Sequence, residues 1–264
     1  MQITVVHHPL LQVKMSVLRD INTNCPTFRR VIGEVAMLLT FEATKNIPLE
    51  THPVTTPLAE TTGHSINGTV NVIPILRAGL GFLEGVLSVL PEANVGPIGM
   101  ARDEETLEPV EYYCKIPKDL DAYNIVVDPM LATGGSAVAA INQLKKRGLK
   151  NITFMCLVAA PEGVKRLNEA HPDVPIITAA LDDHLNEKGY IVPGLGDAGD
   201  RIFGTLQGYE RAGASQLGRI FYGNRYRGFQ ALYLPKTQCG CCDCEESPNC
   251  GHGLQRYSQG FAPL

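Results

Sequence analysis

The sequence lacks any apolar stretch long enough to cross a membrane and any segment typical of a secretion signal. A membrane-spanning helix needs about 20 consecutive apolar residues, and no run in the 264 residues approaches that length. The stretch from Met1 to Pro9 has neither a positively charged start nor an apolar core. We therefore expect a cytoplasmic protein with no membrane partner.

An excess of positive charge is also missing. The net charge is −4, of which residues 1–205 contribute −6 and residues 206–264 contribute +2. An acidic main domain argues against non-specific binding of nucleic acid, so no nucleic-acid partner is expected for it. If the protein binds a polyanion, its arginines must be concentrated locally. Arg77 and Arg102, each following a predicted strand, are placed to do so.

Residues 1–205 contain no metal-binding pattern. The three cysteines, at positions 25, 114 and 156, are scattered and are expected to be free thiols in a reducing compartment. None of the histidines has a partner at metal-ligand spacing, so they are interpreted as surface or packing residues. We assign no metal centre to this part of the chain.

The most informative stretch, Val126 to Ala137, reads VVDPMLATGGSA. It has no Gly-Lys-Ser/Thr ending, which excludes a Walker loop, and no Gly-x-Gly-x-x-Gly dinucleotide motif. Instead, a β-branched run ends in Asp128, and a turn of small residues leads into an amphipathic helical pattern. Glycines let a backbone approach an anion, and the amides of a helix start point at it. The pattern favours a ribose-phosphate site, with an ordinary strand-turn-helix as the alternative.

Strand and helix patterns alternate along the chain, which predicts an α/β fold with a parallel sheet and helices on both faces. A helical stripe covers Leu11 to Lys45, and prolines 48, 53 and 57 predict an irregular connection. Helices are expected from Gly79 to before Pro91, over 134–147 and from Pro161, and strands over 70–76, 95–100, 125–127, 152–158 and 176–181. Ligands of such sheets bind beyond the carboxyl ends of the strands, where Arg77, Arg102 and Asp128 are predicted to converge.

The 126–137 stretch resembles the phosphoribosyl-diphosphate (PRPP) motif of type I phosphoribosyltransferases. Its Asp-Pro-Met-Leu-Ala-Thr-Gly-Gly form is similar to the uracil phosphoribosyltransferase branch. Three more stretches of the chain match that branch: PILRAGLG at 74–81, RDEETLEP at 102–109 and YIVPGLGDAGDR at 190–201. The resemblance covers residues 1–205 and implies transfer of the phosphoribosyl group of PRPP to uracil, giving UMP and pyrophosphate.

The resemblance also implies roles for individual residues. Asp128 and Arg102 are the expected catalytic residues, and uracil is expected to be held by Ile191, Gly196, Asp197 and Ala198. The expected PRPP-binding residues are Arg77, Arg102, Asp128, Pro129, Met130, Leu131, Ala132, Thr133, Gly134, Gly135, Ser136 and Asp197. Mg²⁺ is expected with PRPP, without an assigned set of protein ligands. Relatives commonly form homo-oligomers, and some are activated by GTP, so both are kept as expectations.

The polar stretch from Asp103 to Pro117 has two interpretations. It can be a flap that closes over the reacting centre and excludes water, or a plain surface hairpin. Ala101, where many relatives carry an aromatic residue, is a departure from the family pattern.

Residues 206–264 form a second region, a cysteine-rich extension that the resemblance does not explain. Cys241, Cys244, Cys250 and His252 are candidate ligands of a Zn²⁺ ion, and a disordered extension is the alternative. Arginines here also alternate with Tyr and Phe, a pattern that can bind RNA. The alternative function is therefore a nucleotide-sensing, RNA-binding regulator built on the same fold.

Overall fold

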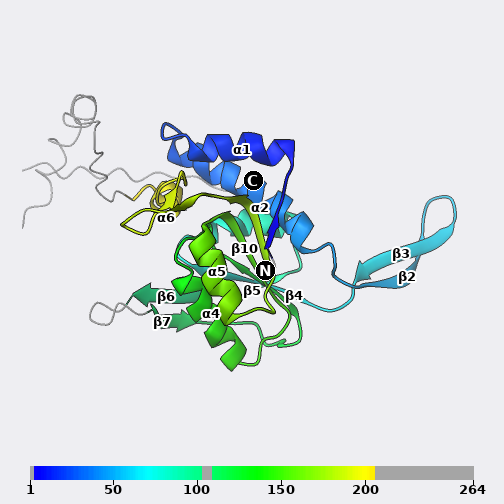
Figure 1. The fold of residues 1–264 in the computed structure, drawn as a ribbon. Helices are drawn as coiled ribbons and strands as arrows, with labels where there is room; N and C mark the ends of the chain where they lie inside the picture. The colour runs from blue at the N-terminus through cyan, green and yellow to red at the C-terminus, as the bar shows by residue number, and fades with distance from the viewer. Residues whose placement is uncertain (1–2, 103–108, 206–264) are drawn as a thin grey trace, which may run out of the picture. The chain divides into compact units, whose positions relative to one another are not determined.

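A computed structural model describes residues 3–102 and 109–205 of the chain (Figure 1). The cysteine-rich extension, with its candidate zinc ligands and its basic-aromatic pattern, lies outside these residues. No helix in the described ranges is both long and apolar enough to span a bilayer.

The centre of the fold is a mixed sheet with the strand order β1-β11-β10-β8-β4-β6-β7. All neighbours along this path are parallel except β6 and β7, which are antiparallel. Short strands β5 and β9 pair with β4 and β10, respectively. The strands are β1 (Ile3–Val5), β4 (Val70–Leu76), β5 (Asn94–Val95), β6 (Ile98–Arg102), β7 (Pro109–Cys114), β8 (Tyr123–Val127), β9 (Met130–Leu131), β10 (Ile152–Ala159) and β11 (Ile176–Leu181).

Six helices among the described residues cover both faces of this sheet, as predicted (Figure 1). One apolar core joins one face to α1, α2, α3 and α6, and a second core joins the other face to α4 and α5. Within β4, Val72 packs into the first core and Ile73 into the second. This alternation explains why the strand is apolar on both sides. The helices are α1 (Pro9–Arg19), α2 (Cys25–Ala43), α3 (Leu80–Val89), α4 (Gly135–Lys146), α5 (Pro161–Ala170) and α6 (Ala198–Phe203).

The segment expected to be helical over 11–45 is divided in the structure into two helices, separated by residues 20–24. Asn24 begins the second one as its N-cap, where its side-chain oxygen accepts a hydrogen bond from the Thr27 amide at 2.9 Å. Pro26 follows in the first turn, where its missing N–H costs nothing. The apolar stripe continues through both helices, so periodicity alone hides the break.

The irregular connection expected around prolines 48, 53 and 57 is wrong. The structure has an antiparallel hairpin of β2 (Leu49–Thr55) and β3 (Glu60–Ile66), which extends away from the sheet (Figure 1). Pro53 lies inside β2 opposite Thr62. A strand with only one neighbour tolerates proline, since one of its edges needs no donors. The remaining strands, β12 (His184–Leu185) and β13 (Ile191–Val192), form a small antiparallel pair.

Candidate active site

Several predicted segments meet at the carboxyl ends of the central strands. The turn after β4 packs directly against the end of β8, because a Cβ added at Gly79 would lie 2.5 Å from the Val127 carbonyl oxygen. Only glycine permits that approach. It brings Arg77, at the start of the turn, next to the strand that ends at Asp128.

The predicted phosphate turn is the N-terminus of α4. Gly134 is the N-cap in a left-handed conformation, with φ +74, and it offers no side-chain cap. The amides of the first helical turn therefore have no partner within the helix. Thr133 and Ser136 are exposed beside them. A turn of this form is suited to bind an anion through N–H groups and hydroxyls.

Neighbouring α5 packs against the backbone of this turn and supports it. A Cβ at Gly163 would lie 2.3 Å from the Ala132 carbonyl oxygen, so the helix lies against the backbone of the turn. Pro129 and Leu131 are buried, and their carbonyl oxygens accept sheet hydrogen bonds from Leu157 and Ala160. Side chains at these two predicted positions therefore serve packing and fix the direction of the loop.

Asp128 lies at the end of β8 and is partly buried. Burial raises the pKa of its carboxyl group to about 7, a net effect in which a hydrogen bond from the Met130 amide lowers the pKa and the neighbouring charge of Asp197 adds to the rise. Asp128 and Asp197, predicted from separate motifs, therefore lie close enough to affect one another. A carboxyl group that titrates near neutral pH at such an edge is typical of a functional site.

Arg77 extends from the turn after β4 with 61% of its side chain exposed. Its Nη2 atom lies 3.9 Å from Oδ1 of Asp200, and its guanidinium carbon lies 5.7 Å from the centre of the Phe203 ring. The Leu76–Arg77 peptide bond is cis. Most of the guanidinium hydrogens remain available to a ligand.

Residues 191–198, the predicted uracil segment, are held by their backbone. Gly194 and Gly196 have φ angles of +58 and +78, and a Cβ at Gly194 would lie 2.1 Å from the Ile191 carbonyl oxygen. The side chains of Ile191 and Ala198 are in the core. Ile191 and Ala198 can therefore bind a flat ligand only through their main-chain groups.

An ion pair that sequence reasoning missed anchors this segment. Arg19 binds both oxygens of Asp182 at 2.8 and 2.5 Å and also donates to the Gly194 carbonyl oxygen at 2.8 Å. The Gly194 amide in turn donates to Asp182 at 2.8 Å. Asp182 follows β11 and is almost fully buried, with 4% of its side chain exposed. The amide and the carbonyl group of Gly194 are thus both held by one pair of charged side chains.

Helix α6 packs the uracil segment against the Arg77 turn. A Cβ at Gly81 would lie 2.8 Å from the Ile202 side chain, and one at Gly199 would lie 3.8 Å from the Ala78 Cβ. Asp197 is the N-cap of α6 and accepts a hydrogen bond from the Asp200 amide at 2.9 Å. The predicted PRPP and uracil residues are therefore neighbours in space.

Arg102 ends β6, but its side chain is outside the described residues, as are residues 103–108 of the predicted flap. Residues 109–114 of that stretch form β7, which pairs with β6. Arg147, the C-cap of α4, binds Glu111 of β7 at 2.7 Å and so connects β7 to the helix. That the 103–117 stretch closes as a flap over the reacting centre stays a prediction.

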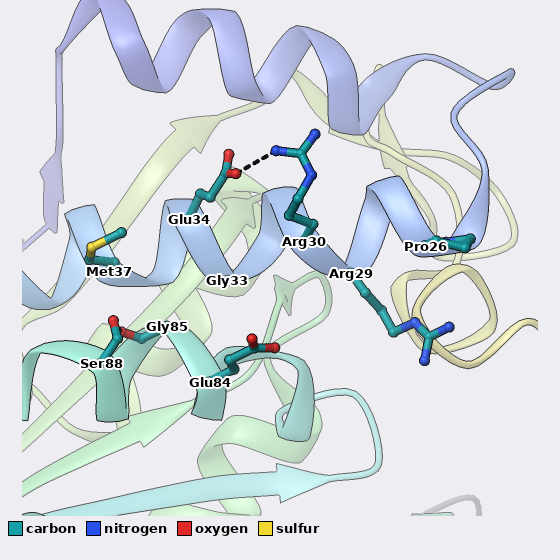
Figure 2. Close-up of a pocket in the computed structure, with 9 residues that line it drawn as sticks. All are labelled: Pro26, Arg29, Arg30, Gly33, Glu34, Met37, Glu84, Gly85 and Ser88. Carbon is teal, nitrogen blue, oxygen red and sulfur yellow. Dashed lines mark hydrogen bonds and ion pairs between the residues drawn. The ribbon is translucent and has the colours of Figure 1, made fainter. Parts of the chain in front are cut away.

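A cavity of about 480 Å³ lies elsewhere, between α2 and α3. Figure 2 shows Arg30 paired with Glu34 on α2, with Glu84 on the neighbouring α3. None of the residues predicted to bind PRPP or uracil lines it. It is separate from the site at the strand ends. Among the residues that the structure describes, no cluster of three or more acidic, histidine or cysteine side chains forms a metal site.

Comparison with known proteins gives the family. A model of the uracil phosphoribosyltransferase family matches residues 5–205. The chain belongs to the uracil phosphoribosyltransferase family. A curated uracil phosphoribosyltransferase from Streptococcus sanguinis (strain SK36) is 58% identical over 206 residues, covering 77% of this chain and 99% of that protein. Another, from Streptococcus uberis, is 60% identical over 203 residues, covering 76% and 97%. The solved structure of AQ2163 from Aquifex aeolicus is similar with a TM-score of 0.72 and 40% identity, covering 76% of this chain and 97% of that one.

These relatives confirm the predicted family. Uracil phosphoribosyltransferase similarity stops at residue 205, where the structure's described residues also end. No comparison favours the alternative of an RNA-binding regulator, whose motivating pattern lies outside the described residues.

Proposed function

We propose that this chain transfers the phosphoribosyl group of PRPP to uracil, giving UMP and pyrophosphate. The observation that carries the proposal is the meeting, at one sheet edge, of an uncapped helix start, the acid Asp128, the exposed Arg77 and the glycine-rich 191–198 segment. Membership of the uracil phosphoribosyltransferase family supports the choice of uracil.

A panel of bases with labelled PRPP and Mg²⁺ tests the proposal. Uracil should be converted to UMP, and adenine, guanine and hypoxanthine should be left unreacted. No UMP from uracil, or equal use of a purine, would refute the proposed activity.

The substrate needs a site for each of its two anionic ends. Residues 132–136 bind the 5′-phosphate through amides of α4 and the hydroxyls of Thr133 and Ser136. Arg77 and Arg102 bind the pyrophosphate, since guanidinium groups match phosphate oxygens in pairs. Asp128 accepts hydrogen bonds from the ribose hydroxyls between these ends. Asp197 contacts both the sugar and the base.

Mg²⁺ suits the same substrate, because it prefers phosphate oxygens, one or two carboxylates and water. The described residues offer two neighbouring carboxylates, Asp128 and Asp197, and no larger acidic cluster, which fits a metal ion that arrives with PRPP. Bound in this way, the ion neutralises charge on the leaving pyrophosphate. We assign it no complete set of protein ligands.

Uracil is recognised through hydrogen bonds with main-chain groups of Ile191, Gly196 and Ala198. Its edge alternates carbonyl oxygens with an N–H, and a backbone held open by glycines can match it. The bond from C1′ to pyrophosphate breaks as the bond from C1′ to N1 of uracil forms, with oxocarbenium-like charge on the ribose, and the N1 proton of uracil is released together with pyrophosphate. No protein nucleophile is required. The chain aligns the reactants, stabilises the leaving group and excludes water.

The location, oligomeric state and regulation of the protein form a separate part of the proposal. We infer a cytoplasmic homo-oligomer, with GTP as a candidate effector, from the resemblance to the family. Sedimentation of the purified chain, and UMP formation with and without GTP, test these two points.

The pH profile should report the titration of Asp128. Burial raises the pKa of this carboxyl group to about 7, whereas ribose hydroxyls are best bound by its ionised form. We expect kcat/KM for PRPP to rise with pH up to about 7 and then level off, with the inflection missing in Asp128→Asn. An unchanged inflection in that variant would assign the titration to another group.

Arg102→Ala should separate the two substrates. Because Arg102 is proposed to bind the pyrophosphate alone, kcat/KM for PRPP should fall roughly 100-fold. The KM for uracil should stay within threefold. Steady-state kinetics with each substrate varied in turn give both numbers, and equal losses for the two substrates would contradict the role.

A further inference from the structure

Asp200, on α6, is a buried acid with too few partners. Its side chain is only 9% exposed, and its Oδ1 atom accepts a hydrogen bond from the Thr205 hydroxyl at 2.6 Å. Its Oδ2 atom accepts none from any residue within 3–102 or 109–205. Burying a carboxylate is costly unless a cation or several donors compensate it. The position of Asp200 therefore calls for a cationic partner.

Arg77 is that partner. Its Nη2 atom is 3.9 Å from Oδ1 of Asp200, just outside hydrogen-bonding distance. The arginine is largely exposed, so a small rotation brings its N–H groups onto the carboxylate without disturbing the core. Hydrogen bonds of this kind are often long in the unliganded state and shorten when substrate binds. The nearby Arg201 is used differently, since it donates to the Leu195 carbonyl oxygen.

The two side chains also sit on backbones that are fixed relative to each other. Helix α6 packs on the turn after β4 through the Gly81–Ile202 and Gly199–Ala78 contacts described above. The Asp200 amide donates to Asp197, so one helical turn carries both a residue of the substrate site and the acid beside Arg77.

We propose that Asp200 is a positioning residue, which holds the Arg77 guanidinium ready for the pyrophosphate of PRPP. The proposal rests on the proposed function of the site. An exposed arginine that is oriented before its ligand arrives loses less conformational freedom on binding. Asp200 acts only through Arg77 and touches no substrate. Its effect should therefore appear in PRPP use and disappear when Arg77 is removed.

Asp200→Asn tests the first half of this expectation, because it keeps the shape and the acceptor for Thr205 while removing the charge. We expect kcat/KM for PRPP to fall about tenfold, as for coupled charged pairs. The KM for uracil should stay close to wild type, and the melting temperature should not fall, because the change removes a buried charge that is incompletely compensated. Asp173→Asn is the matched control, since it removes an exposed carboxylate that pairs with Lys145 at 2.7 Å outside the site. It should change neither substrate constant.

A double-mutant cycle with Arg77→Gln tests the second half. In that background Asp200→Asn should change kcat/KM for PRPP less than twofold. A tenfold loss in both backgrounds, no loss in either, or tighter use of PRPP in the single variant would overturn the proposal.

Calorimetric titration of PRPP with Mg²⁺ into the same four proteins repeats the cycle without turnover. A wild type that binds PRPP but makes no UMP would refute the proposed function while leaving the Asp200 cycle readable. Additive effects on PRPP binding, with normal turnover of the wild type, would refute the Asp200 role alone.

Discussion

Asp128→Asn is expected to lower kcat by roughly 100-fold or more, because an amide is a weaker acceptor for the ribose hydroxyls than a carboxylate and carries no charge. The variant should remain folded, since Asn has the same shape and Asp128 contributes no ion pair to the core among the described residues. Single-turnover measurements with saturating PRPP and uracil give the chemical step directly.

The same substitution should stabilise the protein at alkaline pH. The pKa of Asp128 is raised from 3.8 to about 7 in the folded state, so the folded state holds this proton more tightly than the unfolded chain. Its contribution to stability is complete below pH 4 and is lost as pH rises to about 7. Asn avoids that loss. The melting temperature of Asp128→Asn should therefore exceed that of wild type at pH 8, by about 2–4 °C for each kcal/mol relieved, and match it at pH 4.

Asp121→Asn is the control for both readouts. Asp121 precedes the opposite end of the same strand, where it is 81% exposed and pairs with Lys150 at 3.1 Å. Its loss should change neither turnover nor the pH dependence of melting. Turnover within threefold of wild type in Asp128→Asn would remove Asp128 from the reaction.

Local signals in the sequence predict the central sheet well. The strands over 70–76 and 176–181 are confirmed to the residue, because a mostly apolar run of six or seven residues between turn-forming residues has few alternatives in an α/β protein. Gly148, just after α4, and Pro161, at the start of α5, mark their helices as expected. The sheet edge at which the site lies follows from the same reasoning.

The errors have identifiable causes. The break between α1 and α2 is encoded by Asn24 and Pro26, a cap signal that the continuous apolar stripe outweighed. The hairpin over 49–66 is largely exposed, so it lacks the apolar alternation that reveals a strand. Its prolines favour a loop when sequence is read alone.

Contacts between distant residues could not be predicted in this way. The Arg19–Asp182 pair joins residues 163 positions apart, and no motif connects them. One clue was present, since Asp182 follows a predicted strand just as Asp128 does. The rule that collects functional side chains at the strand ends therefore applied to Asp182 too. What it could not reveal is that this acid holds the uracil segment rather than a ligand.

Asp182→Ala should have the second large effect, on stability and on uracil use together. The change leaves the Arg19 guanidinium with one of its three hydrogen bonds and leaves the buried Gly194 amide without its acceptor. Removing one member of a buried pair typically costs about 3–5 kcal/mol. Because the lost contacts fix Gly194, we expect the KM for uracil to rise about tenfold or more, with the KM for PRPP nearly unchanged. Thermal melting and kinetics with varied uracil measure the two effects.

A second variant separates them. Arg19→Met combined with Asp182→Ala removes both charges, so no partly buried guanidinium is left without its carboxylate, and part of the lost melting temperature should return. The Gly194 turn still lacks its two side-chain contacts, so the KM for uracil should stay high. Recovery of both properties together would mean that Asp182→Ala acts on uracil only by loosening the whole domain. Recovery of stability alone would identify the ion pair as the support that shapes the uracil segment, since the glycines at 194 and 196 give that segment its conformation but cannot hold it in place.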